Sequence, residues 1–339
     1  MLCLLFFFVL EVALRAAGFH YSRQVSYMRF NFPNPNELHN IFEPDPELLW
    51  RMRPGYDFGG GFPPLNDQGF RGRDFSGDVK KDAIKIMCLG DSVTFGRPEV
   101  AYPRMLEKEL EKRLRKEVAA YNFGVSGYSS WQGLKLMSRY LQEVKPDVVI
   151  ILFGWNDHWL AMGYPDSEQT TEGKPPTDAG PIKDLRAYQL INKVAAKAQA
   201  RLAERPLVLR VPPEDYRANL ASMIKMARDS GASVVLATSP SAIKLGVVPD
   251  YLTYLNFIRE EDDLEKLHSR YNNIVREAAE KHDVPLADLD LIFKKRDVTS
   301  LFERPDKDLI HPNTRGYEII TGEMAEVVAA NLKGKGTSD

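Results

Sequence analysis

The chain has 339 residues, a length that allows two domains or one large α/β domain with extensions. At 44% hydrophobic and 27% charged residues, its composition is that of an ordinary globular protein, which excludes a disordered or fibrous chain. The 45 Lys and Arg and the 47 Asp and Glu residues give a net charge of −2 and are interspersed, so we expect no nucleic acid partner. The two cysteines, Cys3 and Cys88, lie in an apolar N-terminal run and in a predicted buried strand, which excludes a disulfide framework. No Cys/His spacing indicates a zinc site, and we expect no bound metal.

The N-terminal segment, residues 1–10 (MLCLLFFFVL), carries no charge. Ten residues are too few to span a bilayer, which needs about 20. The run is typical of the apolar core of a signal peptide, although the cationic segment that should precede it is missing. If Glu11 and Arg15 pair on one helical face, the apolar stretch reaches residue 19 and could be a signal anchor. A start upstream of Met1 and a buried terminal helix are further alternatives. We expect residues 1–19 to be a signal peptide or signal anchor, so that the chain is exported or held at a membrane with its main domain outside the cytoplasm.

Residues 20–81 are rich in Pro, Gly, Asn and aromatic residues and follow no sustained period. This composition predicts an extended arm that packs on the main domain. Within it, Arg71 and Arg73 could bind an anionic or sugar substrate, but a salt bridge to the domain is the favoured interpretation.

The main domain is predicted over residues 82–333, where apolar runs alternate with amphipathic segments. The apolar runs show no polar alternation, which is typical of strands covered on both faces of a parallel sheet, and they span residues 83–89, 118–123, 147–153, 233–238 and 284–289. Apolar residues that recur every three or four positions predict helices over 106–114, 134–141, 216–227, 264–278 and 317–327. The order of these elements predicts an α/β fold with a parallel sheet between two helical layers. Residues 334–339 are expected to be a flexible tail.

Polar, glycine-containing segments follow three of these strands, at residues 90–96 (GDSVTFG), 122–128 (NFGVSGY) and 154–157 (GWND). A fourth segment, residues 308–311 (DLIH), precedes the C-terminal helix. In open parallel sheets, ligands bind at the carboxyl ends of the strands. These four segments are therefore where we expect the chemistry of the protein.

Together the four segments resemble the motifs of the SGNH hydrolases, also called the GDSL esterase/lipase family. The four residues that name the family correspond, in family order, to Ser92, Gly127, Asn156 and His311, and Val93 stands where the family usually has Leu. The resemblance covers most of the main domain. It implies the three-layer α/β/α, flavodoxin-like fold of that family, hydrolysis of acyl esters, and no metal or organic cofactor.

The resemblance also implies a role for each site residue. Ser92 would be the nucleophile, and a serine hydroxyl needs an adjacent base to take its proton. His311 would be that base, and Asp308, three residues earlier, would orient its imidazole. The oxyanion hole would consist of the backbone N–H groups of Ser92 and Gly127 and the side-chain amide of Asn156. One such donor is typically worth about 10²–10³ in kcat.

Other interpretations of the same residues are weaker. Taken singly, each could be a helix cap or a turn residue, but four such residues converge on one edge of one sheet. His158 directly follows the third segment and is the rival base, whereas His268 and His282 are expected to be solvated. A P-loop is excluded because five residues rather than four separate Gly90 from Gly96. The nucleophile elbow of α/β-hydrolases is absent as well.

Residues 165–181 contain almost no apolar side chain, which predicts a mobile loop that either overhangs the site as a lid or is a plain surface insertion. A helix is expected over residues 183–204. Four side chains between the third segment and the loop are close enough in sequence to line a substrate pocket, although packing beneath the insertion is the alternative: Trp155, His158, Trp159 and Tyr164.

We therefore expect a serine ester hydrolase that acts through an acyl-enzyme on Ser92, with an O-acylated glycan or a lipid-like ester as substrate. One alternative is an O-acyltransferase that acts on extracellular polysaccharide, and another is a non-catalytic glycan-binding or assembly module. Residues 65–75 resemble a segment found in membrane-anchored bacterial relatives of the family, which supports export or anchoring of this chain.

Overall fold

The computed structural model describes residues 2–19, 21, 40–75, 77, 79–169, 182, 184–202, 206–243, 248–255 and 257–335. Parts of the predicted arm (20, 22–39), of the predicted loop (170–181) and of the predicted tail (336–339) lie outside the described residues. The elements below all lie within the described ranges.

The main sheet has five parallel strands in the spatial order β4-β3-β5-β8-β9. Numbered along the chain this order is 2-1-3-4-5, which is that of flavodoxin-like sheets. The strands are β3 Ile84–Gly90, β4 Val118–Gly124, β5 Val148–Leu152, β8 Ser233–Ala237 and β9 Leu286–Ala287. The predicted α/β fold with a central parallel sheet is thus confirmed.

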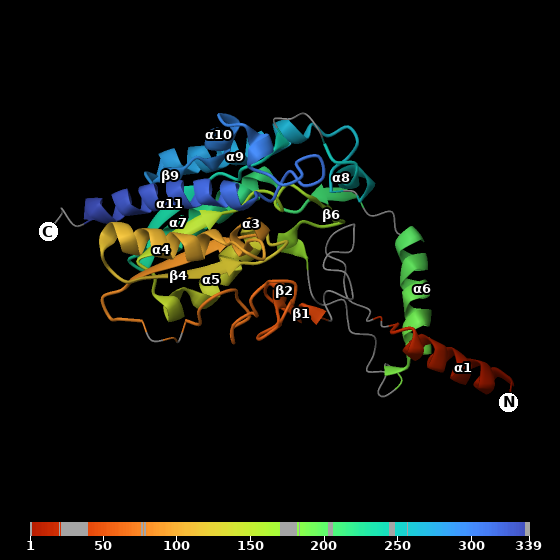
Figure 1. Cartoon of the computed structure of the whole chain (residues 1–339). Helices are drawn as coiled ribbons and strands as arrows, with labels where there is room; N and C mark the ends of the chain where they lie inside the picture. Colours follow the sequence, from red (N-terminus) through yellow and green to blue (C-terminus); the bar gives the residue numbers. More distant parts are fainter. Residues whose placement is uncertain are drawn as a thin grey trace.

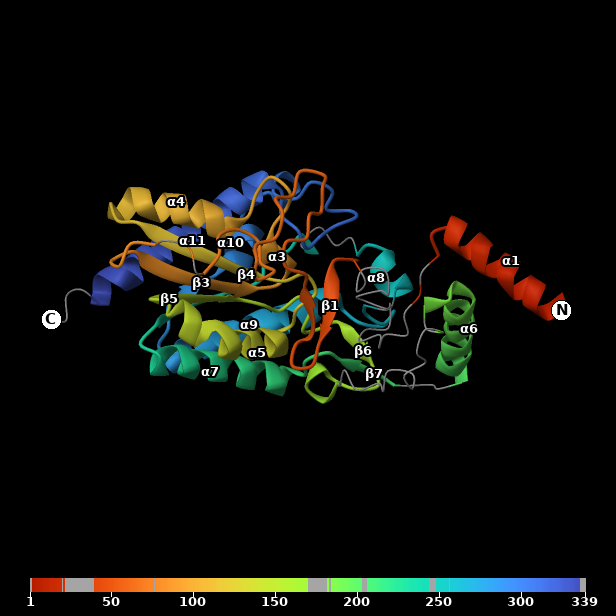
Figure 2. The same ribbon diagram turned by 90° about the horizontal axis from the view of Figure 1, so that it is seen from below.

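Helices cover both faces of this sheet, as Figure 2 shows. One face carries α5 (Ser130–Val144), α7 (Pro213–Asp229) and α9 (Leu264–His282). The other carries α4 (Tyr102–Leu114), α10 (Leu289–Lys294) and α11 (Thr314–Lys335). The four-residue helix α3 (Ser92–Phe95) directly follows β3, and α8 (Tyr251–Tyr254) and a short 3-10 helix, η4 (Val298–Ser300), lie in the later connections.

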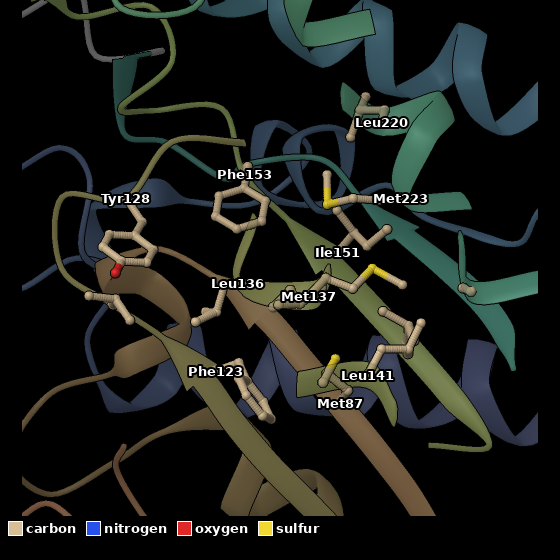
Figure 3. Close-up of a cluster of buried hydrophobic side chains, with 14 of the residues drawn as sticks. Met87, Phe123, Tyr128, Leu136, Met137, Leu141, Ile151, Phe153, Leu220 and Met223 are labelled. Atoms are coloured by element: carbon tan, nitrogen blue, oxygen red, sulfur yellow. The ribbon is translucent and has the colours of Figure 1, made fainter. Parts of the chain in front are cut away.

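The two helical layers enclose two apolar clusters because successive strand residues point to opposite faces. In β3, Met87 and Leu89 pack against α5, α7 and α9, whereas Ile86 and Cys88 pack against α4 and α11. Figure 3 shows the first cluster, in which side chains of α5 and α7 lie against those of the strands. Full burial of one large apolar side chain contributes about 1.5–3 kcal/mol, so these clusters hold the strand ends in place.

Within the predicted arm, residues 40–75 contain an antiparallel hairpin of β1 (Phe42–Asp45) and β2 (Leu49–Met52). Trp50 in this hairpin is fully buried, and its carbonyl accepts a hydrogen bond of 2.6 Å from the Tyr128 hydroxyl. Asp45 accepts both hydrogen bonds of a bidentate pair with Arg139 of α5, at 2.7 and 2.8 Å. This part of the arm therefore packs on the layer formed by α5.

A second antiparallel pair, β6 (Leu160–Met162) and β7 (Leu207–Leu209), lies outside the main sheet. The chain between these strands contains a 3-10 helix, η1 (Asp166–Glu168), and α6 (Arg186–Leu202), which falls within the predicted helix 183–204. Only the first five residues of the predicted loop, 165–169, belong to the described part.

The N-terminal helix α1 (Leu2–Ala16) lies beside α6, away from the main sheet (Figure 1). The expected pairing of Glu11 with Arg15 is present at 2.7 Å. Glu11 also accepts a hydrogen bond of 2.8 Å from the backbone N–H of Ala187, in the first turn of α6. Among the described residues, no helix combines the length and the apolar character that crossing a membrane requires.

Candidate active site

Three of the four polar segments meet at one edge of the sheet because their strands end in register. Gly90, the last residue of β3, pairs with Gly124 of β4 on one side and with Leu152 of β5 on the other. The N–H of Val125 also donates to the Gly90 carbonyl at 3.2 Å. The loops after β3, β4 and β5 are therefore held next to one another at the carboxyl edge.

Ser92 is the first residue of α3, and the preceding Asp91 caps this helix by accepting a hydrogen bond of 2.9 Å from the N–H of Val93. The fourth segment approaches from the other end of the chain. His311 Nε2 lies 2.8 Å from Ser92 Oγ, and His311 Nδ1 lies 2.9 Å from Asp308 Oδ2. The serine, histidine and aspartate singled out in the sequence thus form one chain of hydrogen bonds.

The Asp308 carboxylate accepts hydrogen bonds from two backbone N–H groups and from the His311 ring. Burial alone would raise its pKa, but the hydrogen bonds and charge of His311 and the backbone N–H groups of Ile310 and His311 outweigh that effect and hold the pKa below its usual value. Asp308 is therefore ionised at neutral pH. An ionised carboxylate that accepts from Nδ1 leaves Nε2 of a neutral imidazole free to accept the serine proton.

Gly127 and Asn156, the two other named residues, lie in the loops after β4 and β5. Gly127 occupies the third position of a tight turn that Tyr128 N closes on the Val125 carbonyl at 3.1 Å, and its φ of 81° is one that favours glycine. Asn156 Nδ2 lies 3.4 Å from Asp91 Oδ2. Both residues are therefore carried on loops that flank Ser92.

Three of the four side chains predicted to line a pocket lie in the interior instead. Trp155, His158 and Trp159 are at most 1% exposed, and Trp155 donates from Nε1 to the Pro240 carbonyl at 3.1 Å. The loop after β5 turns these side chains inward, where Trp155 and His158 contact residues of α9 and Trp159 packs on Phe257. Tyr164, by contrast, is 51% exposed.

The histidine predictions also need correction. His268, expected to be solvated, is 1% exposed and stacks on the Trp155 ring at 4.1 Å, because the buried face of α9 includes it. His158, the rival base, faces His268 with 3.1 Å between Nε2 and Nδ1. Burial, together with the charge that His268 would carry, holds the pKa of His158 well below its usual value. His158 is therefore neutral and belongs to a core pair.

Arg71 and Arg73 of the arm have different partners. Arg73 forms the expected salt bridge, with Glu107 at 3.1 Å. Arg71 instead donates to three backbone carbonyls at the end of α3 and just after it, those of Phe95, Arg97 and Pro98. Both arginines border a cavity of about 980 Å³ between the arm and α4, and the residues that line this cavity do not include Ser92 or His311.

The structure also shows charged residues beside the site whose contacts the sequence analysis missed. Arg210 and Asp166 form a fully buried ion pair, and Arg210 donates to the Gly127 carbonyl at 2.7 Å. Asp157 accepts a hydrogen bond of 2.8 Å from the N–H of Ser130, the first residue of α5. No motif marks Arg210 or Asp166, which lie 44 positions apart, whereas Asp157 belongs to the third polar segment, residues 154–157. Among the described residues, no group of three or more His, Cys, Asp or Glu side chains could hold a metal ion.

A 2-1-3-4-5 parallel sheet with these motifs at its carboxyl edge defines a GDSL-type esterase or lipase, an enzyme whose substrates are acyl esters. Residues 88–319 match the model of the GDSL-like lipase/acylhydrolase family, and the chain belongs to that family.

No match was found among curated proteins. Among solved structures, the chain is similar to the lipase/acylhydrolase from Enterococcus faecalis, with 20% identity and a TM-score of 0.46 over 74% of this chain and 96% of that one. It is similar to the acetylxylan esterase Axe2 from Geobacillus stearothermophilus, with 17% identity and a TM-score of 0.44 over 74% of this chain and 96% of that one. A GDSL-like lipase from Bacteroides thetaiotaomicron shares 17% identity with a TM-score of 0.43, over 76% of this chain and 91% of that one.

Proposed function

We propose that the protein is a serine ester hydrolase in which Ser92 forms a covalent acyl-enzyme. The observation that carries this proposal is the contact of Ser92 Oγ with His311 Nε2 at 2.8 Å, extended by the contact of His311 Nδ1 with Asp308 at 2.9 Å. A nucleophile within hydrogen-bond reach of a base, and a base oriented by a third group, is the arrangement that acyl transfer needs.

In the proposed reaction His311 takes the proton of Ser92 as the oxygen attacks the ester carbonyl. The imidazolium then gives this proton to the departing alcohol, which leaves the acyl group on Ser92. Water activated by His311 attacks the acyl-enzyme, and the acid is released with the serine restored. The negative oxygen of each tetrahedral intermediate accepts hydrogen bonds from the N–H groups of Ser92 and Gly127 and from the Asn156 amide.

Two substrate classes are compatible with this chemistry: a small O-acyl group on a glycan and a lipid-like ester. An O-acyltransferase would use the same residues, with a sugar hydroxyl in place of water as the acceptor. A non-catalytic glycan-binding module would have no use for the contacts among Ser92, His311 and Asp308. Hydrolysis is therefore the first choice, with transfer to a polysaccharide as the alternative.

The test is hydrolysis of p-nitrophenyl esters of increasing acyl length by the native chain and by Ser92→Ala. We expect turnover by the native chain and a loss of at least about 10³-fold in Ser92→Ala, because the nucleophile is gone. The matched control is Ser222→Ala, which removes an exposed serine of α7 and should leave turnover unchanged. Diversion of acyl groups to an added acceptor sugar would favour the transferase, and undiminished hydrolysis by Ser92→Ala would refute the proposal.

We further propose that the protein is exported or membrane-associated, with its main domain outside the cytoplasm and α1 in contact with lipid. The support is apolar exposure: Phe6 and Phe8 of α1 are 64% and 66% exposed, and Val194 of the adjoining α6 is 62% exposed. Aromatic and aliphatic side chains gathered on one helix pair fit the apolar boundary of a bilayer.

A further inference from the structure

The β6–β7 region brings two charges into the interior beside the loop that follows β4: Asp166 lies between the two strands, and Arg210 directly follows β7. The side chains of Arg210 and Asp166 are both fully buried, with Nη2 and Oδ2 2.7 Å apart and Nε and Oδ1 3.0 Å apart. Removing two charges from water costs desolvation free energy, which is offset only where further hydrogen bonds satisfy both groups. The remaining partners of this pair therefore indicate what it holds.

The side-chain hydrogen bonds that the two groups make outside the pair all go to one short segment, residues 127–132, while the Arg210 guanidinium also lies over the Trp50 ring at 5.7 Å. Arg210 Nη1 donates to the Gly127 carbonyl at 2.7 Å, and Nη2 donates to Gln132 Oε1 at 2.8 Å. Asp166 Oδ2 accepts from the Ser129 hydroxyl at 2.7 Å. The ion pair thus fastens the turn after β4 and the start of α5 to the β6–β7 insertion.

Gly127 needs such an anchor because glycine has the widest conformational freedom of any residue. Its φ of 81° excludes most side chains from this position, so the chain gains the turn but loses the stiffness that a Cβ would give. A charged donor on its carbonyl fixes ψ of Gly127 and the position of its Cα. An oxyanion donor acts only when it lies about 2.7–3.1 Å from the developing charge, so a small displacement of this residue should lower kcat.

We propose that Arg210, held by Asp166, is a positioning residue that sets the Gly127 N–H in place as an oxyanion donor. This inference rests on the proposed role of Gly127 in ester hydrolysis. Arg210 acts through the backbone of Gly127 and takes no part in proton transfer. Its loss should therefore lower kcat and leave both KM and the pH profile close to those of the native chain.

The decisive variants separate positioning from the general cost of an unpaired buried charge. Arg210→Met leaves Asp166 alone, so it should lose both stability and activity. The double variant with Asp166→Leu replaces the whole pair by apolar side chains, which is often neutral for stability. We expect the double variant to regain thermal stability while kcat stays about 10- to 100-fold below native, because Gly127 still lacks its anchor. Arg210→Lys keeps the positive charge but loses the planar guanidinium that donates to several partners at once, so its kcat should lie between those of Arg210→Met and the native chain.

The matched control is Arg139→Met, which removes a bidentate Arg–Asp pair between the arm and α5. It should cost stability without lowering kcat. Hydrogen–deuterium exchange supplies a readout independent of activity: exchange of the peptide that contains residues 126–132 should be faster in the Arg210 variants than in the native chain or Arg139→Met.

The outcomes distinguish this inference from the proposed function. If the double variant regains kcat together with stability, or if exchange of residues 126–132 is unchanged, the positioning role is wrong even though the esterase proposal stands. If native chain and Ser92→Ala are equally inactive, the esterase proposal fails. The exchange measurement then still decides whether Arg210 fixes the Gly127 turn.

Discussion

Asp308 carries two functions on one carboxylate, and this explains the short spacing of the fourth segment. Oδ1 accepts from the backbone N–H groups of Ile310 and His311, both at 3.1 Å, and Oδ1 and Oδ2 lie 3.0 and 2.9 Å from His311 Nδ1. The same side chain therefore shapes the loop and orients the imidazole. A spacing of three residues makes both contacts possible without help from another element.

At this scale the sequence located the segments but not every side-chain direction. The site segments were predictable because apolar runs define where strands end, and parallel strands end at one edge. Trp155, His158 and Trp159 were misplaced because an irregular loop has no period from which a side-chain direction can be read. The burial of His268 was missed for another reason. The buried face of α9 includes this polar residue as well as apolar ones, and only the apolar residues follow the helical period.

The buried carboxyl of Asp157 predicts how the stability of the protein depends on pH. Burial raises its pKa to about 7, partly offset by hydrogen bonds from Ser130, and no described residue hydrogen-bonds its Oδ2. Because the pKa of Asp157 is higher in the folded chain than the unfolded value of 3.8, its protonated carboxyl favours the folded state. This contribution to the free energy of unfolding is fully present below pH 3.8 and is lost as the pH rises towards 7.

Asp157→Asn should therefore remove part of this loss. From pH 4 to pH 8 the native chain should lose more free energy of unfolding than the variant, by on the order of a few kcal/mol. Urea unfolding of both proteins at the two pH values measures the difference. An identical pH dependence would show that Asp157 is not the titrating group, and any pH-independent cost of the amide cancels in the comparison.

Among the elements, the contact of β4 with α3 determines where the nucleophile lies. A Cβ built on Gly124 would lie 2.2 Å from the backbone nitrogen of Phe95, so only glycine lets α3 approach the end of β4. The atoms that such a Cβ would meet belong to the backbone of α3, which cannot rotate away as a side chain could.

Gly124→Ala should accordingly displace α3 and with it Ser92. We expect a fall in kcat of at least about 10-fold and a stability loss of about 1–3 kcal/mol. The matched control is Gly322→Ala in α11, where an added Cβ meets nothing within 4 Å and should stabilise the helix by about 0.5–1 kcal/mol. Thermal unfolding and esterase assays check both, and native kcat in Gly124→Ala would argue against this contact as the determinant.

Long elements were predictable and short ones were not. Four strands of the main sheet and five of the helices that cover it appear close to their expected positions, because long apolar or periodic runs carry a strong signal. The exceptions are the predicted strand 284–289, which is reduced to β9 (Leu286–Ala287), and α10 (Leu289–Lys294), which was not predicted. The hairpin β1–β2 and the pair β6–β7 have three or four residues per strand, too few for any period to show.

For the whole molecule, segments outside the main sheet and its two helical layers contact the candidate site. The arm reaches the end of α3 through Arg71, and Arg210, directly after β7, reaches the Gly127 turn. Contacts between residues so far apart in sequence could not be predicted, since they depend on how the completed layers bring distant loops together.

The proposed membrane contact belongs to the scale of the whole molecule and is tested with phospholipid vesicles that contain phosphatidylcholine and phosphatidylglycerol. Sedimentation should carry the native chain down with the vesicles. The double variant Phe6→Ser, Phe8→Ser should bind at least about 10-fold more weakly, because two aromatic side chains no longer enter the bilayer. Leu291→Ser, which changes an exposed apolar residue of α10, is the control. Equal sedimentation of all three proteins would refute lipid contact through α1.

The central claim, that Ser92 is the nucleophile, is tested most directly by labelling with a fluorophosphonate and locating the adduct by peptide mass spectrometry. The account predicts one adduct, on Ser92, that forms in parallel with the loss of ester hydrolysis and is absent from Ser92→Ala. An adduct on another residue, or full hydrolysis after Ser92 has been completely modified, would contradict it.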